Sequence, residues 1–246
     1  ELVDVVVPLG LELAHRGQAN ADVAYLGSGE NYGPTVYRTV DGGANWEMVV
    51  THPAWNWMTP FTTVEMDWID YYLDWGWGGD PHQVSVSPTN PNCVAFSEDG
   101  RTFRSDDGGY HWFPCYTEEV PAASTWYQTR GIDVTNVYRY VIDPKWPLRH
   151  YLCNTDIGFS RSEDGGVTWK WASNGSPWRN TYYDLALDPD VDGKMWAAVS
   201  NHHDAPHWKV IRQNVPTLSG GVVISTDWGE TWAEIGHSGG LPDGMV

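Results

Sequence analysis

The chain has 246 residues and a formal net charge of −18, because 32 Asp and Glu residues stand against 14 Lys and Arg residues. Such a surplus of carboxylates repels polyanions and excludes nucleic acid as an expected partner. No apolar run approaches the roughly 18 to 20 residues that a membrane-spanning helix needs, so we expect a soluble protein with no membrane partner.

The aromatic composition bears on ligand chemistry. Sixteen Trp and 13 Tyr residues occur against only five Phe residues. Trp and Tyr combine a flat apolar face with a polar edge, which suits the faces of sugar rings and equally the interior of a protein. The composition alone therefore leaves both uses open.

A turn with the pattern S/T-x-D-x-G-x-x-W occurs four times along the chain. Each copy follows a short strand-like run and leads into another that begins at its tryptophan. The hydroxyl and the Asp can accept hydrogen bonds from backbone N–H groups across the turn, the later Gly accepts a positive φ, and the Trp covers the end of the hairpin. The copies span Thr39–Trp46, Ser105–Trp112, Ser162–Trp169 and Ser225–Trp232, at intervals of about sixty residues.

Upstream of the last three copies lies a second signal, in which two strand-like runs flank a turn marked by Pro. It covers Val84–Ser97, Tyr140–Asn154 and Leu185–Ser200, whereas the first repeat is looser here. One repeat thus predicts four short antiparallel strands, the pattern of a β-propeller blade.

We therefore expect an all-β fold, a single β-propeller of four-stranded blades. The predicted ranges are 1–246 for the propeller, roughly 1–54, 82–120, 136–172 and 181–236 for its blades, and 55–81 for an aromatic-rich insertion. About four blades do not obviously close a ring, so the chain is expected to be part of a larger propeller, with closure by four blades as the alternative. The start at Glu1 shows no basic and apolar signal-peptide pattern, so we expect a processed or truncated N-terminus.

The four boxes resemble those of the Asp-box, or BNR-repeat, β-propellers, which include sialidases, family 74 xyloglucanases and sortilin-type receptors. The resemblance covers essentially the whole chain. It implies a propeller fold, but it leaves the function open because the same box serves hydrolases and receptors. Enzymes of these families build their sites on the face opposite to the boxes.

The box aspartates are expected to be structural. In a four-stranded meander the chain reverses alternately at two edges, so the Pro-marked turns and the Asp boxes share one edge. The other edge collects the loops between second and third strands and the connections between blades, where polar and aromatic residues concentrate. We therefore interpret the box aspartates as fasteners and expect the chemistry on the opposite edge; they are Asp41, Asp107, Asp164 and Asp227.

The loop N-T-D-I-G at Asn154–Gly158 resembles the T-D-I-G-G stretch that carries a catalytic aspartate in family 74 enzymes. Asp156 is the matching position. Phe159 stands where that family has a second glycine, and the region that supplies the other catalytic carboxylate has no match here. Three interpretations stay open for Asp156: a catalytic carboxylate, a ligand or metal contact, and a turn-forming Asp whose side chain binds backbone amides before Gly158.

Glycoside hydrolysis commonly uses two carboxyl groups about 5 to 9.5 Å apart. Asp133 and Asp204 are the candidate catalytic partners of Asp156 on the same edge, with Glu30 as a third candidate. The spacing does not choose among them. A structural role is the alternative for Asp133.

Two arginines precede expected first strands, which line the channel of a propeller. Arg130 lies in T-R-G-I-D and Arg179, followed by Asn180, in P-W-R-N-T. They can bind a carboxylate or sulfate group bidentately, or they can neutralise acids such as Asp133 and Asp184. We assign Arg130, Arg179 and Asn180 to substrate binding.

The loop N-H-H-D-A-P-H-W brings His202, His203, Asp204 and His207 into six positions. Neutral imidazoles with a carboxylate are metal ligands in many proteins. Adjacent His side chains diverge on a strand, however, so a polar loop that lines the cleft is the alternative. We assign His202 and His203 to substrate binding and expect no metal.

The insertion is too long for an ordinary connection between blades. Its Trp75 and Trp77, together with Tyr32 of the loop Gly27–Pro34, are candidate faces for stacking on sugar rings. Its acids can bind sugar hydroxyls or calcium. A capping subdomain with a short amphipathic helix in the segment 64–75 is the alternative.

The three cysteines lack the spacing of a zinc site or of a disulfide framework. They are Cys93, Cys115 and Cys153. Cys93 and Cys153 are placed at equivalent strand positions in successive repeats, so we expect buried free thiols.

We expect a secreted, carbohydrate-active protein, a glycoside hydrolase that acts on a polysaccharide or oligosaccharide in the central cleft through paired carboxylates. A non-catalytic glycan- or protein-binding propeller is the alternative. No cofactor is expected, with calcium as the open alternative. Further blades or a second chain are the expected partners that complete the ring.

Overall fold

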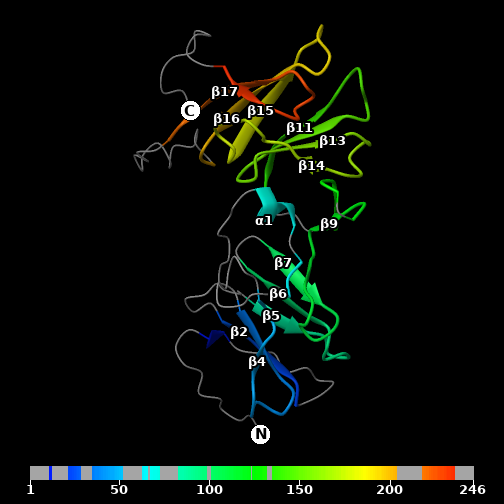
Figure 1. Cartoon of the computed structure of the whole chain (residues 1–246), viewed down its shortest axis with the longest axis vertical. Coiled ribbons are helices and arrows are strands. Elements are labelled where there is room, and N and C mark those ends of the chain that lie inside the picture. The colour runs from blue at the N-terminus through cyan, green and yellow to red at the C-terminus, as the bar shows by residue number, and fades with distance from the viewer. Residues whose placement is uncertain are drawn as a thin grey trace. The chain divides into compact units, whose positions relative to one another are not determined.

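The computed structural model of the chain describes residues 11–12, 22–28, 35–51, 63–65, 67–72, 83–98, 101–122, 124–131, 135–203 and 218–235. Within these residues the chain forms four four-stranded antiparallel sheets, a two-stranded hairpin and one short helix, α1 (Trp68–Tyr72) (Figure 1). Consecutive strands pair in each four-stranded sheet, which is the form of a β-propeller blade, so the predicted all-β fold class is confirmed. The position of α1 also confirms the short helix predicted within residues 64–75.

The chain divides into two compact units of two sheets each. Unit 1 comprises Glu1–Thr117 with Arg130–Val134, and unit 2 comprises Glu118–Thr129 with Thr135–Val246. The four sheets span 11–48, 83–114, 137–171 and 181–234.

The two sheets of unit 1 pack around one core, because strands alternate buried and exposed side chains with a period of two. Strand β2 contacts β5, and the core joins Tyr25 and Val36 of the first sheet to Phe96, Phe103 and Trp112 of the second sheet. The strands of the first sheet are β1 (Leu11–Glu12), β2 (Ala24–Ser28), β3 (Thr35–Thr39) and β4 (Glu47–Met48). Those of the second sheet are β5 (Gln83–Val86), β6 (Val94–Ser97), β7 (Thr102–Ser105) and β8 (Phe113–Pro114).

The two sheets of unit 2 pack in the same way. Strand β15 contacts β11 and β12, and the core joins Tyr151 and Phe159 of one sheet to Tyr182, Met195 and Trp232 of the other. The strands of the third sheet are β11 (Val137–Ile142), β12 (His150–Asn154), β13 (Phe159–Ser162) and β14 (Lys170–Trp171). Those of the fourth sheet are β15 (Thr181–Leu187), β16 (Met195–Ser200), β17 (Gly220–Ser225) and β18 (Ala233–Glu234).

A hairpin of β9 (Thr117–Glu119) and β10 (Tyr127–Thr129) precedes the third sheet, where the sequence predicted only a connection. The backbone of Tyr127 exchanges two hydrogen bonds of 2.7 Å with that of Trp169. The hairpin therefore pairs with the backbone of the tryptophan of an Asp box. The sequence analysis did not predict this pairing.

The four box segments, called here the aspartate turns, share one hydrogen-bond pattern. In the turn at Ser162–Trp169, the Gly166 N–H donates to Ser162 Oγ over 2.9 Å and the Thr168 N–H donates to Asp164 Oδ1 over 2.9 Å. The other three turns contain the equivalent pair of bonds. The Gly165 N–H also donates to Leu148 O over 2.9 Å, so the aspartate turn and the Pro-marked turn lie at the same edge of the sheet, as predicted.

Positive φ extends over two residues of each aspartate turn rather than the one predicted. Gly165 and Gly166 have φ values of 78° and 89°, and in the fourth turn Trp228 takes the first of these positions with φ 65°. A non-glycine residue pays about 1 kcal/mol or more for this conformation. The Arg149 guanidinium, 4.2 Å from the Trp228 ring centroid, offsets part of that cost.

The rings of Trp46, Trp112 and Trp169 lie against the second glycine of their own turns, as predicted, but the indole N–H groups of the four box tryptophans bond in two ways. Trp46 and Trp169 donate their indole N–H to Gly43 O and Gly166 O of their own turns. The buried Trp112 and Trp232 instead donate across to the preceding sheet; the acceptors are Val49 O at 3.0 Å and Ala172 O at 2.8 Å. Trp112 and Trp232 belong to the second sheet of their units, so each has a preceding sheet of the same unit to contact.

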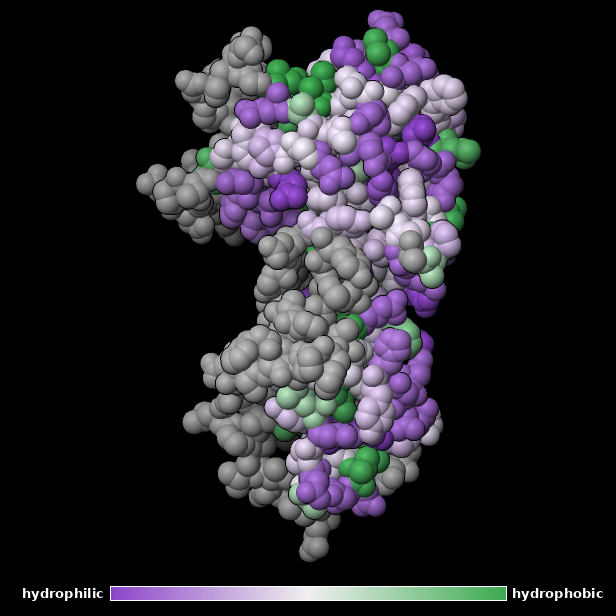
Figure 2. Space-filling view, in the orientation of Figure 1, coloured by the Kyte–Doolittle hydropathy of each residue, from purple (hydrophilic) through white to green (hydrophobic). Residues whose placement is uncertain are grey.

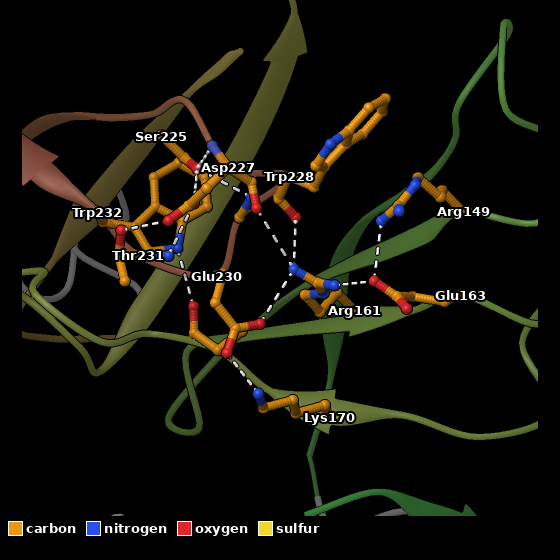
Figure 3. Close-up of polar contacts among 12 residues, drawn as sticks. Arg149, Arg161, Glu163, Lys170, Ser225, Asp227, Trp228, Glu230, Thr231 and Trp232 are labelled. Atoms are coloured by element: carbon orange, nitrogen blue, oxygen red, sulfur yellow. Dashed lines mark hydrogen bonds and ion pairs between the residues drawn. The ribbon is translucent and has the colours of Figure 1, made fainter. Parts of the chain in front are cut away.

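Arg161 of β13 joins the two sheets of unit 2 at this same edge (Figure 3). Its guanidinium donates to Trp228 O over 3.3 Å and pairs with Glu230 over 3.1 Å and with Glu163. Lys170 pairs with Glu230 as well. The aspartate turn of the fourth sheet is thus held by basic side chains of the third.

All three cysteines are free thiols, but only Cys153 is buried. The predicted equivalence of Cys93 and Cys153 is wrong, because Cys93 precedes β6 whereas Cys153 lies within β12, opposite Phe159. Burial, with the charge of Asp184 as a second cause, raises the pKa of Cys153 to about 12. Cys153 is therefore a neutral core thiol at ordinary pH.

Candidate functional site

The turn between β12 and β13 lies at the edge opposite to the aspartate turns. It is very tight: the Ile157 N–H donates to Thr155 O over 2.6 Å, and Asp156 between them has φ 62°. Gly158 closes the turn with φ 75°, and a Cβ there would lie 2.5 Å from Ser173 Oγ and 2.6 Å from Arg179 O. Glycine is thus required at this position, whereas the conformation of Asp156 is tolerated at a cost.

Among the described residues, the carboxylate of Asp156 accepts no hydrogen bond from the backbone N–H groups of its own turn. Among the described residues it accepts a hydrogen bond from Thr155 Oγ1 over 3.2 Å and faces His203 Nδ1 at 3.5 Å from Oδ1. Its side chain is 21% exposed. The turn-forming interpretation is therefore correct for the backbone, but the predicted bonds from backbone amides to this carboxylate are not present among those residues.

Asp164, eight positions further along, shows the contrast. Its carboxylate accepts bonds from the backbone N–H groups of Val167 and Thr168 and from the hydroxyls of Ser162 and Thr168. Burial by itself raises the pKa of Asp164, but the hydrogen bonds, led by those of Thr168, outweigh it and lower the pKa. Asp164 therefore has the structural role that the sequence predicted, because its carboxylate holds its own turn together.

Neighbouring segments hold the Asp156 turn in place. The Asp156 N–H points at Thr181 Oγ1 over 3.4 Å, and the Gly158 N–H donates to Asn180 O over 3.0 Å. On the other side, Thr155 Oγ1 lies 2.6 Å from Thr135 Oγ1. The first strands of both sheets of unit 2 therefore begin beside Asp156.

The two histidines assigned to substrate binding lie where β16 ends. The His202 N–H donates to Ser200 Oγ over 3.1 Å, and the rings of His202 and His203 are 4.8 Å apart, edge to face. The Nδ1 atom of His203 lies 3.5 Å from Asp156 Oδ1, and the His203 side chain is 49% exposed. The structure thus brings together Asp156, His202, His203 and Asn180 of the predicted set.

Three residues of this edge, Tyr138, Arg139 and Tyr183, were missed by the sequence analysis, which named Asp184 only as an acid that an arginine could neutralise. Tyr138 of β11 and Tyr183 of β15 contact each other with ring centroids 5.2 Å apart, and the Tyr183 hydroxyl donates to His202 O over 2.9 Å. Arg139 and Asp184 follow them and form an ion pair of 3.3 Å. The signal that could have found them is a tyrosine near the start of both first strands, V-Y-R-Y and T-Y-Y-D.

The predicted arginines do not behave alike. Arg130 belongs to unit 1, is exposed and donates its backbone N–H to Tyr116 O over 3.0 Å. Arg179 belongs to unit 2 and is exposed, next to the Asp156 turn. The suggestion that it neutralises Asp184 is wrong, because Arg139 takes that place.

The other predicted site residues lie outside the described residues. They are Tyr32, Trp75, Trp77, Asp133 and Asp204, together with the further candidates Glu30 and His207. Within the part of the chain that the structure describes, no group of three or more His, Cys, Asp or Glu side chains is placed to hold a metal ion. No helix of that same part is long and apolar enough to cross a membrane. The face shown in Figure 2 is mostly hydrophilic, with hydrophobic residues in small separate groups.

A cavity of about 120 Å³ lies elsewhere in unit 2, between the Pro-marked turns of its two sheets. Both of its lysines are paired, Lys145 with Asp192 over 3.1 Å and Lys194 with Asp188 over 2.9 Å. The cavity is at the edge of the aspartate turns, and its third acid, Asp143, accepts the backbone N–H groups of Lys145 and Trp146. The chemistry of the Asp156 edge is therefore the better candidate for a site.

Comparison with known proteins gave structural matches alone: no family model matches the chain, and no curated protein does. An ancestral GH74 enzyme is 16% identical over 94% of this chain and 26% of its own, with a TM-score of 0.32. The GH74 xyloglucanase of Xanthomonas campestris is 18% identical over 93% of this chain and 30% of its own, with a TM-score of 0.31. YCF48 bound to a D1 peptide is 16% identical over 90% of this chain and 66% of its own, with a TM-score of 0.28.

The chain spans less than a third of the length of those two GH74 structures and about two thirds of the YCF48 structure. Identities below 20% and TM-scores near 0.3 do not establish a shared activity. A functional proposal must therefore rest on the residues of the Asp156 edge.

Proposed function

We propose that the chain is part of an Asp-box β-propeller that acts on polysaccharides, and that Asp156 is a catalytic carboxylate of a glycoside hydrolase. The proposal rests on a difference between the hydrogen bonds that the carboxylates of Asp164 and Asp156 accept. Asp164 binds its own turn through both oxygens, whereas Asp156 accepts one hydroxyl and faces an exposed imidazole. A carboxylate that its own turn does not need can act as a base or nucleophile.

The backbone of Asp156 supports the proposal. A left-handed conformation costs a non-glycine residue about 1 to 2 kcal/mol, and such positions persist where neighbouring structure or function requires them. Here Gly158 already supplies the positive φ that closes the turn. Asp is among the few residues other than glycine that adopt this conformation, and it leaves the Asp156 carboxylate outside the backbone bonds of its turn among the described residues.

The proposed site extends to residues that the fold brings near Asp156 or that share its predicted edge. Asp133 and Asp204 are proposed as the second carboxylate. The proposed substrate-binding residues are Arg130, Arg179, Asn180, His202, His203, Tyr32, Trp75 and Trp77. We further propose a secreted protein without a resident cofactor, calcium being the open alternative, whose partners are a polysaccharide and further blades or a second chain.

The test is release of reducing sugar from a panel of polysaccharides. Asp156→Asn keeps the size of the side chain and removes its charge, so we expect the rate to fall by about a hundredfold or more while the fold is retained. Asp164→Asn is the matched control in the same sheet, with a lower melting temperature and an unchanged rate expected. A wild-type rate in Asp156→Asn overturns the assignment.

A non-catalytic glycan-binding protein is the second candidate. It is favoured by one observation: among the described residues, the group that faces Asp156 is the imidazole of His203, not a second carboxylate. Binding of polysaccharide by the wild-type protein, with no release of reducing sugar from any member of the panel, would establish this alternative. The other non-catalytic alternative is a propeller that binds a protein ligand at the same edge.

A further inference from the structure

The first strands of both sheets in unit 2 share an irregularity. The pairing of β11 with β12 shifts register between Val137 and Arg139, and the pairing of β15 with β16 shifts between Tyr182 and Asp184. The extra residue is a tyrosine in both cases, Tyr138 and Tyr183. Bulges of this kind are frequent beside active sites because they re-aim one side chain.

The described part of unit 1 does not reach the equivalent position. Strand β5 begins at Gln83, and its four pairs with β6 correspond to the pairs that follow the bulges in β11 and β15. The two matching bulges, each with a tyrosine as the extra residue, are therefore a feature that the two sheets of unit 2 share.

The bulges bring the two tyrosines together. Their ring centroids are 5.2 Å apart at an interplanar angle of 44°, and Tyr138 is 43% exposed. Tyr183 is half-buried, and its hydroxyl, which donates to His202 O over 2.9 Å, ties it to the residue beside His203. The pair is thus an anchored aromatic surface next to Asp156.

Polar groups flank this surface. Arg139 and Asp184 form an ion pair of 3.3 Å, and both side chains are more than half exposed. The Tyr183 hydroxyl bonds to His202, whose neighbour His203 faces the carboxylate of Asp156. Aromatic faces beside hydrogen-bonding groups match a pyranose ring, which has apolar C–H faces and a rim of hydroxyls.

We propose that Tyr138 and Tyr183 form a stacking platform that binds a pyranose ring of the glycan beside Asp156. The inference rests on the proposed function for the nature of the ligand, but it does not require that Asp156 be catalytic. The Arg139–Asp184 pair offers a donor and an acceptor to hydroxyls of that ring.

A peptide is the competing ligand, because β11 is an edge strand of its sheet and edges can accept an added strand. The bulge at Tyr138 argues against this, since a register shift interrupts the row of backbone groups that an added strand would pair with. The platform therefore favours a ring laid on the tyrosines over a strand laid along β11.

The experiment is calorimetric titration with hexasaccharides of β-1,4-glucan, β-1,4-xylan and β-1,4-mannan, in the Asp156→Asn background so that no probe is cleaved. We expect at least one hexasaccharide to bind, and Tyr138→Ala and Tyr183→Ala each to weaken it about tenfold, the effect of losing one stacking face. Tyr138→Phe keeps the face and should bind as before.

Tyr140→Ala is the matched control on the same strand. Tyr140 is 49% exposed, but its hydroxyl lies 2.5 Å from His150 Nδ1, toward the aspartate-turn edge. Equal affinity in all these variants, or no binding of any hexasaccharide at millimolar concentration, overturns the platform. Binding of a tryptophan-containing peptide instead of the sugars overturns it in favour of strand addition.

The two proposals fail separately. If the alanine variants lose affinity but wild-type protein releases no reducing sugar, the platform stands and the catalytic role of Asp156 falls. If Asp156 is required for hydrolysis but Tyr138→Ala and Tyr183→Ala bind normally, the platform falls alone.

Discussion

The two units hold their sheets together in the same way. In unit 1, Arg38 stands just before the hydroxyl residue of its aspartate turn and donates to Tyr110 Oη over 3.0 Å and Asn92 Oδ1 over 3.2 Å of the next sheet. In unit 2, Arg161 has the same place and reaches Trp228 O and Glu230. In each unit a buried tryptophan of the second sheet donates a hydrogen bond to the first sheet. We call this combination of an arginine and a tryptophan the interlock, and both units have it.

The two edges of unit 2 differ. One edge carries the aspartate turns and the bonds of Arg161 and Trp232 that join the sheets, whereas the other carries two bulges and the group of Tyr138, Tyr183, His203 and Asp156. The joining bonds recur in unit 1 through Arg38 and Trp112. We therefore assign stability to the first edge and propose function for the second.

The largest expected effect tests the interlock through its tryptophans. Trp232 is 4% exposed and donates to Ala172 O, so Trp232→Ala creates a cavity and leaves an acceptor unmet. We expect a loss of about 3 to 5 kcal/mol in the free energy of unfolding. Trp169→Ala, in a turn whose tryptophan bonds only within itself through the indole, should cost about 1 to 2 kcal/mol.

Urea unfolding followed by circular dichroism measures both variants. Trp112→Ala and Trp46→Ala should repeat the same order in unit 1, since Trp112 is fully buried and Trp46 is 40% exposed. Equal losses for Trp232→Ala and Trp169→Ala would contradict the interlock.

A smaller effect is expected from the arginines. Arg161→Met keeps most of the buried side-chain volume but removes the bonds to Trp228 O and Glu230, so we expect a loss of about 2 kcal/mol. Arg104 has the equivalent place in β7, but its side chain is 55% exposed and pairs with Asp106 of its own turn. Arg104→Met should therefore cost less than about 0.5 kcal/mol.

Thermal unfolding of Arg161→Met and Arg104→Met tests whether the arginine stabilises the contact between two sheets or only its own turn. A loss in Arg104→Met as large as that in Arg161→Met would show that the arginine acts within its own turn, and the comparison of the units would lose its physical basis.

The fold was largely predictable because its determinants are local. The hydroxyl, Asp and Gly of each aspartate turn form hydrogen bonds within eight residues, so the four copies of the pattern predict four sheets. The sequence could not say which tryptophans reach across, because Trp112 and Trp232 are chemically the same as Trp46 and Trp169 and differ only in belonging to the second sheet of their unit. It could not predict Trp228 at a positive φ, since the stabilising Arg149 comes from another strand.

The site was predictable only in part. Asp156 and the two histidines stood out as polar residues in loops at the expected edge. The pairing of Tyr138 with Tyr183 depends on two register shifts and on the packing of β15 against β11, which no single-strand pattern shows. The ion pair of Asp184 with Arg139 instead of Arg179 follows from the same packing.

The smallest expected effect concerns the fastening edge and depends on pH. Asp164→Asn loses the acceptor for the Thr168 hydroxyl, so we expect about 1 kcal/mol of destabilisation at pH 7. The pKa of Asp164 is lowered in the folded state, since its hydrogen bonds outweigh the opposing effect of burial. The ionised carboxylate therefore stabilises the fold above the unfolded pKa of about 3.9, and this contribution is lost as the pH falls through the lower folded pKa.

The variant lacks that titration, so the gap between wild type and Asp164→Asn should narrow as the pH falls from about 5 to 3, because the wild-type carboxylate becomes protonated. Melting temperatures at half-unit pH steps measure the gap. A gap that stays constant with pH for Asp164→Asn would contradict a stabilising role of the ionised Asp164 carboxylate.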